Sequence, residues 1–199
     1  IVSSLATLSY DKRRSKFFTS ELITLLKLVD EKKVDPNTLF GSWAGAFGNF
    51  QFMPSTIKNY ALDHNNDGLI DLKNIEDSFA SAANYLNNLG WNEELPCFYN
   101  IDLKNTIPME YLNTSAKKIK NKKNLNFFLK YINNNNISNK YNNTSVAIVT
   151  PDADIIENAD IFSPAFIVFD NYELILKWNR SLRFGLAICT LRDKFKNEL

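Results

Sequence analysis

Oxygen-bearing side chains stand at alternate positions of one short segment, residues 63–71, with the sequence DHNNDGLID, except at position 7, which is Leu69. Asp63, Asn65, Asp67 and Asp71 stand at positions 1, 3, 5 and 9 of this segment, and Gly68 stands at position 6. The pattern strongly constrains the backbone, because alternate side chains must turn inward around a sharp bend at the glycine. Ca²⁺ takes six to eight oxygen ligands on such a loop, so the segment predicts an EF-hand-like calcium site.

The end of this loop departs from the usual pattern. Position 12, normally a bidentate Glu, is Asn74, and the next carboxylate is Asp77 at position 15. A longer loop closed by Asp77 would restore the missing ligand. The expected calcium ligands are Asp63, Asn65, Asp67, the Leu69 carbonyl, Asp71 and Asp77. The alternative is an Asn- and Asp-rich surface turn that binds no metal.

Composition limits the partners of the chain. Lys+Arg 23 against Asp+Glu 22 gives a net charge of +1, so no overall field attracts nucleic acid or an anionic membrane. The sequence has no apolar run of bilayer length and opens with no signal-peptide pattern, and we expect a monomer. It begins with Ile1 inside a helix-like apolar stretch, which predicts an absent upstream part. Cys97 and Cys189 are interpreted as two separate core thiols, since two cysteines alone do not establish a disulfide.

The first half of the chain has the apolar spacing of helices. Residues 1–10 are helix-like, and residues 17–29 form an apolar stripe of Phe18, Leu22, Leu25 and Val29, widened by Phe17, Leu26 and Leu28. Pro54 begins a short helix. A further helix spans residues 77–89, with Asp77 as its cap and Gly90 as its stop.

The second half contains strand-like segments. Residues 146–149 are β-prone, and residues 166–169 and 173–178, separated by Asp170-Asn171, predict a hairpin. Residues 181–195 predict a last helix. We expect an α+β, mainly α fold in three parts. They are a core with the calcium loop at 1–93, a small β-containing lobe at 94–164, and a hairpin and C-terminal helix returning to the core at 165–199.

Five segments, in this order, together resemble the lytic murein transglycosylase B family. They are RRSKFFTSELITLL, GSWAGAFGNFQFMPST, the loop from Asp63 to Asp77, SFASAANYLNNLGW and PAFIVFDNYELILKWNRS. The resemblance implies a lysozyme-like helical core with an EF-hand-like calcium loop and a small antiparallel β-lobe. It also implies an enzyme of the bacterial periplasm or cell envelope. Such an enzyme cleaves the β-1,4 bond between MurNAc and GlcNAc of peptidoglycan glycan strands and leaves a 1,6-anhydromuramoyl product.

The family uses one glutamate for this reaction, first as acid and then as base. The resemblance places it in a Glu-Thr-x-x-Gly motif upstream of the stretch that matches residues 1–10, and this motif does not occur in the sequence. Glu21 is the remaining candidate, because its angular position falls inside the apolar arc of its helix. The preferred interpretation of Glu21 is a buried structural carboxylate paired with Arg13, Arg14 or a backbone donor.

The resemblance implies seven substrate-binding residues: Arg13, Arg14, Ser42, Gln51, Tyr85, Trp178 and Asn179. Ser42 and Gln51 would hydrogen-bond an acetamido group, or alternatively only stabilise their Gly-rich loop. Arg13 and Arg14 would face the peptide or a carboxylate of the substrate, or alternatively form a solvated turn. The glycines of the loop, Gly41, Gly45 and Gly48, would let the backbone approach a sugar ring.

The other three residues would complete the cleft. Tyr85 would lie against the glycan, unless it belongs to the core, and Trp178 with Asn179 would form the floor of the site. Phe184 stands where many family members have a tyrosine, so a hydroxyl has been lost. Two further functions remain open besides the enzyme: a non-catalytic peptidoglycan-binding remnant and a calcium-binding interaction module.

Overall fold

The computed structural model describes residues 1–133, 136–153 and 155–198, without the side chain of residue 197. The chain forms two compact units, Ile1–Leu89 and Gly90–Leu199. Our division into parts at 1–93, 94–164 and 165–199 stays a prediction. The fold is mainly α with a small sheet, as the sequence predicts.

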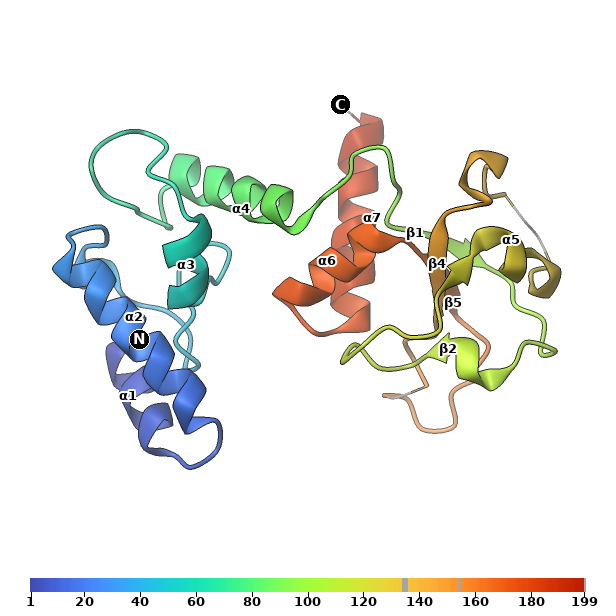
Figure 1. Ribbon diagram of the computed structural model, residues 1–199, viewed down its shortest axis with the longest axis horizontal. Coiled ribbons are helices and arrows are strands. Elements are labelled where there is room, and N and C mark those ends of the chain that lie inside the picture. The colour runs from blue at the N-terminus through green and yellow to red at the C-terminus, as the bar shows by residue number, and fades with distance from the viewer. Residues whose placement is uncertain (134–135, 154, 199) are drawn as a thin grey trace. The chain divides into compact units, whose positions relative to one another are not determined.

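The first unit is helical (Figure 1). Its helices are α1 (Val2–Tyr10), α2 (Ser15–Asp30), α3 (Pro54–Tyr60) and α4 (Ile75–Leu89). The face of α2 that becomes buried carries Phe18, Glu21, Leu25 and Leu28. The apolar stripe predicted for this helix is therefore too wide, because Leu26 on its flank is 50% exposed.

The start of α4 corrects the prediction that Asp77 caps this helix. The helix begins at Ile75, two residues earlier, and Asn74 Oδ1 accepts a hydrogen bond of 2.7 Å from the Glu76 N–H. Asn74 therefore performs the capping role. Asp77 lies in the first turn and is fully buried. Gly90, with φ +96°, follows the helix as expected.

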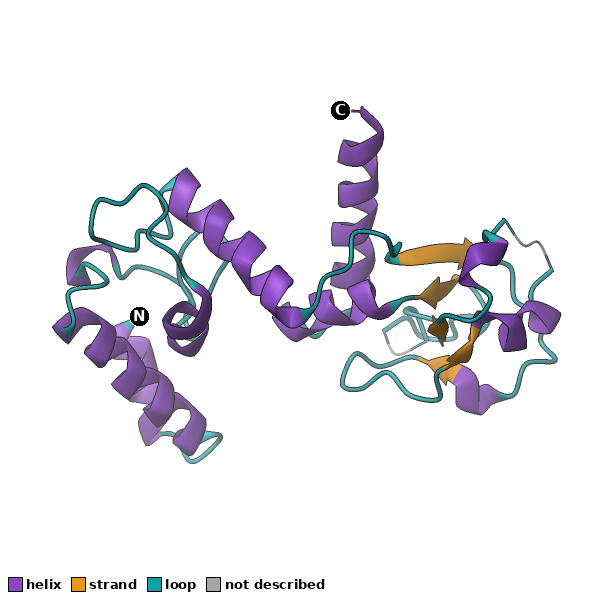
Figure 2. Ribbon diagram, turned by 45° about the horizontal axis from the view of Figure 1, so that its top comes forward, coloured by secondary structure: helices purple, strands orange, loops and turns teal. Residues whose placement is uncertain are grey.

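The second unit combines a five-stranded sheet with α-helices and short 3-10 helices (Figure 2). Its elements are β1 (Phe98–Ile101), β2 (Leu112–Asn113), β3 (Lys123–Asn124), α5 (Leu125–Phe128), β4 (Ser145–Val149), β5 (Ala165–Val168), α6 (Asp170–Trp178) and α7 (Leu182–Glu198). The strand order is β1-β5-β4-β2, with β3 paired to β4. Most pairs are antiparallel, but β2 runs parallel to β4. Both ribbon views place α7 and α5 on opposite sides of the sheet.

The predicted hairpin is wrong, because its second half is α6 and not a strand. The first turn of α6 contains Asp170 and Glu173, whose negative charges favour a helix N-terminus. Asn171 is buried and does not form a turn. Its side chain accepts from the Asn92 N–H at 3.0 Å and donates to the carbonyls of Asn92 and Leu95.

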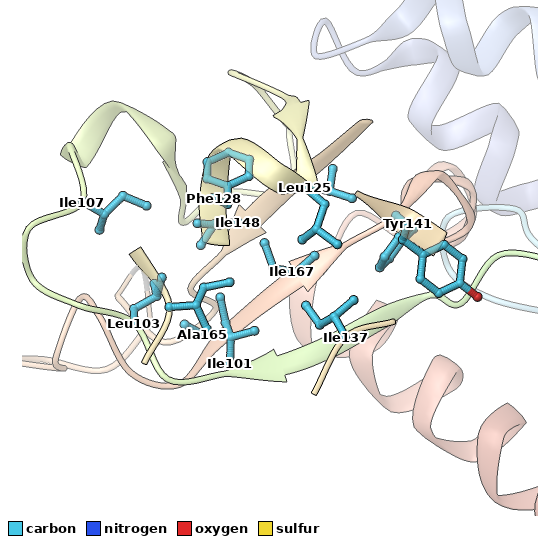
Figure 3. Packing of buried hydrophobic residues seen from close by; sticks show 13 residues of the cluster. Ile101, Leu103, Ile107, Leu125, Phe128, Ile137, Tyr141, Ile148, Ala165 and Ile167 are labelled. Carbon is cyan, nitrogen blue, oxygen red and sulfur yellow. The ribbon is translucent and has the colours of Figure 1, made fainter. Parts of the chain in front are cut away.

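The core of the second unit lies between the sheet and the irregular segments that cover it (Figure 3). It consists of Ile101, Leu103, Ile107, Leu125, Phe128, Ile132, Ile137, Tyr141, Val146, Ile148, Ala165, Ile167 and Phe169. In β4, four consecutive residues from Val146 to Val149 are buried. A continuous apolar run is what a central strand requires when both of its faces are covered.

The two cysteines correct a second expectation. Cys97 and Cys189 form a disulfide that joins the segment before β1 to α7, and they are not separate thiols. The residues lie 92 positions apart in sequence, and only the folded sheet and helix bring their Cα atoms within 5.9 Å. Tyr172 of α6 contacts the start of the same helix, α7, because its hydroxyl donates a hydrogen bond to the Leu182 carbonyl at 2.7 Å.

Candidate functional site

The Gly-rich segment after Phe40 folds as two consecutive tight turns. Phe47 forms isolated bridges with both Gly41 and Phe52. Between them, Ser42 fixes the first turn, because its N–H donates to the Ala46 carbonyl at 2.7 Å and its Oγ accepts from the Ala46 N–H at 3.1 Å. The Ser42 hydroxyl, predicted to bind an acetamido group, therefore already accepts a hydrogen bond within its own loop. The side chain is partly accessible.

Gln51 occupies the second turn with φ +53° and is exposed. Its backbone N–H and its side-chain Nε2 both donate to the Gly48 carbonyl, at 3.1 and 2.9 Å. These bonds orient the amide. No hydrogen bond within the described residues uses its Oε1, so this acceptor remains available to a ligand N–H.

The glycines of this loop are required by the packing of the chain against itself. A Cβ on Gly45 would lie 2.3 Å from Leu5 Cδ2, and one on Gly48 would lie 2.3 Å from Leu72 Cβ. At Gly41 it would lie 2.2 Å from the Ala46 carbonyl oxygen. The absence of side chains at these positions is therefore explained by the packing of the protein itself, and the approach of a sugar ring to this backbone stays a prediction.

Asn49 was missed by the sequence analysis. Its N–H donates to the Leu72 carbonyl at 2.8 Å, and its Nδ2 donates to the Lys73 carbonyl and to Ser78 Oγ at 3.1 Å. The residue thereby joins the Gly-rich loop, residues 41–53, to the end of the loop from Asp63 to Asp77, here called the acidic loop, and to α4. An Asn after a glycine in a turn-rich segment was the available signal, because a short amide reaches backbone groups easily.

Tyr85 lies on α4 against aromatic rings of two other segments. Its ring forms edge-on contacts with Phe52 at 5.6 Å and with Tyr60 at 4.9 Å. Burial, and next the neighbouring Tyr60, raise the pKa of the Tyr85 hydroxyl. The hydroxyl thus stays protonated at neutral pH and is suited to donate a hydrogen bond. The residue is half-buried, so core packing and ligand contact are compatible.

Arg13 and Arg14 are both exposed, and they line a hollow together with Trp43 of the Gly-rich loop. Arg14, with φ 61°, precedes α2, and its guanidinium lies 4.4 Å from the centroid of the Phe17 ring. A hollow of about 240 Å³ contains both arginines and Trp43, and it is lined by Leu8, Asp11, Arg13, Arg14, Phe18 and Trp43. Trp43 was also missed, although it is 79% exposed. An exposed indole beside forked cations is suited to a sugar that carries an acidic group.

Glu21 is a structural carboxylate, as preferred from the sequence. It is 4% exposed, and its two oxygens accept from the Ser55 N–H at 2.8 Å and from the Ser55 hydroxyl at 2.7 Å. The carboxylate therefore satisfies the first turn of α3. The expected partners Arg13 and Arg14 are not used, but the alternative of a backbone donor is confirmed.

Trp178, Asn179 and Phe184 belong to the second unit. Trp178 ends α6, and the exposed Asn179 caps it with an N–H bond of 3.1 Å to the Ile175 carbonyl. Phe184 lies in the first turn of α7 and is half-buried. The structure thus brings Arg13, Arg14 and the Gly-rich loop together within the first unit, and it places Trp178 and Asn179 in the other.

The acidic loop is held by its own carboxylates. Asp63 accepts from the N–H groups of Asp67 and Gly68, at 3.1 and 2.9 Å. Asp77 accepts from the N–H groups of His64 and Asp71, at 2.8 and 2.9 Å. The carboxylate at position 15 therefore bridges the two ends of the loop, which is where a closing ligand was expected.

The ligand atoms of this loop are of the type that a hard cation prefers, but their side chains are not arranged around one ion position. All expected ligands are oxygens, and no ion pair of the described residues involves Asp63, Asp67, Asp71 or Asp77. However, within the described part of the chain no three acidic, His or Cys side chains converge on one metal position. The side chains instead bind backbone N–H groups.

Comparison with known proteins identifies the class to which this fold and these loops belong. The sequence model described as "Transglycosylase SLT domain" matches residues 1–193. The chain belongs to this family. Membrane-bound lytic murein transglycosylase B of Escherichia coli (strain K12) is 46% identical over 92 residues, which are 46% of this chain and 26% of that protein.

Solved structures extend the similarity to both units. The structure of SltB3 from Pseudomonas aeruginosa in complex with NAG-NAM-pentapeptide is 32% identical, with a TM-score of 0.81, over 98% of this chain and 50% of that one. The Escherichia coli lytic transglycosylase Slt35 in complex with calcium is 27% identical, with a TM-score of 0.72, over 94% of this chain and 56% of that one. The chain thus spans about half the length of these solved relatives and about a quarter of the curated one.

Proposed function

We propose that this chain is the substrate-binding part of a lytic transglycosylase that cleaves the MurNAc-GlcNAc β-1,4 bond of peptidoglycan and forms a 1,6-anhydromuramoyl product. The match of the Transglycosylase SLT domain to residues 1–193 carries this proposal. Similarity along nearly the whole chain to a protein solved with NAG-NAM-pentapeptide supports the substrate class.

The residues of the first unit supply binding and orientation. Gln51 offers its free amide oxygen to an acetamido N–H, and Ser42 sits on the preceding turn of the same loop. Tyr85 contributes a protonated hydroxyl from α4. Arg13 and Arg14, beside Trp43, receive a carboxylate-bearing part of the substrate. In the second unit, Trp178 and Asn179 complete the proposed set.

The proton transfers require a carboxyl group that these residues do not provide. The reaction needs an acid for the leaving oxygen and then a base for the 6-hydroxyl of the substrate. We assign both roles to a glutamate of a Glu-Thr-x-x-Gly motif, which this sequence lacks. Glu21 does not serve, because Ser55 binds both of its oxygens.

Digestion of purified sacculi tests this assignment. We expect residues 1–199 to release no anhydromuropeptides, and a version extended upstream to include a Glu-Thr-x-x-Gly motif to release them. Acid-base assistance by one group contributes a factor of about 10² to 10⁴. Mass spectrometry identifies the products, and Gln51→Ala in the extended version should lower the rate.

The control is Glu21→Gln in the short chain. Anhydro products from the short chain that disappear in this variant would make Glu21 the acid and contradict the assignment. An extended version that binds glycan but releases no product would favour the non-catalytic binding remnant.

We also propose that the loop from Asp63 to Asp77 binds one Ca²⁺ through Asp63, Asn65, Asp67, the Leu69 carbonyl, Asp71 and Asp77. Four carboxylates without ion-pair partners among the described residues support this, as does the calcium complex of the relative Slt35. Binding would require Asp77 to exchange at least one backbone N–H bond for the ion.

Calorimetric titration with Ca²⁺ distinguishes the two candidate closing residues. Asp77→Asn should weaken binding by at least about tenfold, since a carboxylate is lost. Asn74→Ala should change it less, because position 12 carries no charge. Equal losses in both variants, or heat-free titration of the unaltered chain, would contradict the proposed ligand set.

Location in the periplasm is the last part of the proposal. Disulfides persist in oxidising compartments, and Cys97–Cys189 is one. One relative is named as membrane-bound. Among the helices of the described residues, none combines the length and the hydrophobicity of a membrane-spanning segment. Thiol alkylation of fractionated cells should find Cys97 and Cys189 protected in the envelope fraction; free thiols there would argue against this location.

A further inference from the structure

Two adjoining hollows in the second unit form a groove with a strong positive charge. They have volumes of about 350 and 260 Å³ and share Ala116, Lys117 and Arg180. We call their union the basic groove. Besides these shared residues, the lining includes Lys118, Glu173, Leu176 and Lys177 in the first hollow, and Ser115 and Ile155 in the second.

The cations of the basic groove lack internal counter-charges. Lys117, Lys118, Lys177 and Arg180 line it, and none of them takes part in an ion pair of the described residues. Glu173 is the acidic residue of the lining, and its charge is already engaged by Lys122 at 2.5 Å. The groove therefore presents positive charge that an anionic ligand can neutralise.

The scaffold of the groove is held in place independently of any ligand. The lysines at 117 and 118 lie on the connection between β2 and β3, whose fold is fixed by the buried side chain of Asn113. This amide accepts from the Lys120 N–H at 2.7 Å and donates to the Lys120 carbonyl at 3.2 Å. Lys122 binds the same connection to the start of α6 through Asp170 at 2.6 Å. A prearranged loop reduces the entropy lost on binding.

The opposite wall comes from the end of α6 and the residues after it. Lys177 and Arg180 flank Trp178 and Asn179, the pair proposed for the floor of the glycan site. A helix C-terminus carries partial negative charge. This charge attracts both cations and offsets part of the repulsion between them. The basic groove is therefore adjacent in sequence and structure to residues of the proposed function.

We propose that the basic groove binds the carboxylates of a peptide stem of peptidoglycan. Arg180 presents a forked donor to one carboxylate, and the lysines act as point charges for a second. The apolar residues of the lining, Ile155 and Leu176 among them, contact small aliphatic side chains of the peptide. The identity of the peptide rests on the proposed function.

The chemistry of the lining favours a peptide over nucleic acid. Single-stranded nucleic acids bind basic grooves that also offer aromatic rings for base stacking. The linings of both hollows, as far as the chain is described, contain no aromatic residue. A concave groove with aliphatic and hydroxyl groups between its cations instead matches a chain with spaced carboxylates.

The probe is a synthetic pentapeptide, L-Ala-γ-D-Glu-L-Lys-D-Ala-D-Ala, titrated into residues 1–199 at low salt, beside the same peptide with its carboxylates amidated. The free acid should bind, and the amidated form should bind at least about tenfold more weakly. Binding of the free acid should also weaken as salt is raised, because the groove is exposed.

Variants locate the binding. Lys117→Gln with Arg180→Gln should weaken binding of the free acid by at least about tenfold, because two charge-assisted contacts are lost. Lys194→Gln is the matched control. This exposed lysine lies in the same unit outside the groove, and its removal should change the affinity less than about twofold. In a second double variant, Lys117→Gln is combined with Arg180→Lys, which keeps the positive charge at position 180 but not the forked donor. It should bind the free acid more tightly than the variant with Arg180→Gln, whereas a folding defect would weaken both equally.

Equal binding of the two peptides, or of the double variant and the unaltered chain, would overturn the inference. Groove-dependent binding of phosphatidylglycerol vesicles without binding of the free peptide would reassign the groove to a lipid headgroup and overturn it as well. The proposed function fails separately. If the extended version digests sacculi while the peptide does not bind, only the groove is wrong; if the peptide binds and no anhydro product forms, only the enzymatic proposal is.

Discussion

Gly48 and Gly68 both hold the backbone at positive φ, +79° and +93°, yet their surroundings differ. A Cβ on Gly48 would lie 2.3 Å from Leu72 Cβ and 2.8 Å from the Leu72 carbonyl oxygen, whereas nothing lies within 4 Å of one on Gly68. The first glycine is required by backbone conformation and by close packing. The second is required by conformation alone.

Replacing each glycine by alanine separates these two causes. Gly68→Ala should lower the free energy of unfolding by about 1 kcal/mol, the cost of a residue with a Cβ at positive φ. Gly48→Ala should cost at least about 2 kcal/mol more, because Leu72 must move and its backbone cannot yield easily. Urea unfolding in the presence of a chelator measures both without a contribution from metal. Equal losses would show that the Gly-rich loop shifts freely.

Single residues also mark the limits of sequence interpretation. The burial of Glu21 follows from its position between apolar residues of α2, and the sequence predicts it. Its partner Ser55 lies 34 positions away, so no local pattern reveals the pair. The same holds for Asn49 and Leu72, because hydrogen bonds between distant loops depend on how the loops meet.

At the scale of elements, α6 shows why a helix can be mistaken for a strand. Leu174, Leu176 and Trp178 alternate as a strand would, while Tyr172 and Ile175 follow helical spacing, so both periods fit. Leu174, Ile175 and Leu176 are all buried in the structure, so neither period alone describes the buried positions. The choice between helix and strand therefore depends on the tertiary packing, which the sequence does not show. Long helices such as α2 and α4 carry enough turns for their period to be clear, and the sequence predicts them well.

Asn171 provides a test of what secures α6. Asn171→Ala removes three hydrogen bonds from a buried amide and takes the side-chain partner from the Asn92 N–H and the Leu95 carbonyl, while the Asn92 carbonyl keeps its bond from the Leu95 N–H. We expect a loss of about 2 to 4 kcal/mol in unfolding free energy. Hydrogen exchange should accelerate at the Asn92 N–H. Asn88→Ala on the exposed face of α4 is the control, with an expected change within about 0.5 kcal/mol. A similar small change at Asn171 would contradict its structural role.

At the scale of the whole molecule, stabilising features of different chemistry fall in different units. The proposed calcium loop belongs to Ile1–Leu89, and the disulfide belongs to Gly90–Leu199. The order of the family segments predicts the general fold, because each matched segment recurs in its place. The disulfide is not predictable in this way, since the distance of 5.9 Å between Cα atoms arises only when α7 packs beside β1.

Scanning calorimetry should therefore distinguish the units by two independent treatments. Ca²⁺ should raise the melting temperature of one transition in proportion to occupancy of the loop, because ligand binds only the folded state. Reduction of the Cys97–Cys189 disulfide should lower the melting temperature of a different transition. The bond closes a loop of 92 positions, for which chain entropy alone corresponds to about 4 to 5 kcal/mol. At a Ca²⁺ concentration near the dissociation constant of the unaltered loop, Asp77→Asn should strongly reduce the first response and leave the second. Cys97→Ala with Cys189→Ala should remove the second response and leave the first. If calcium and reductant instead shift one shared transition, the two units unfold as a single cooperative structure, and the separation of their stabilising features is wrong.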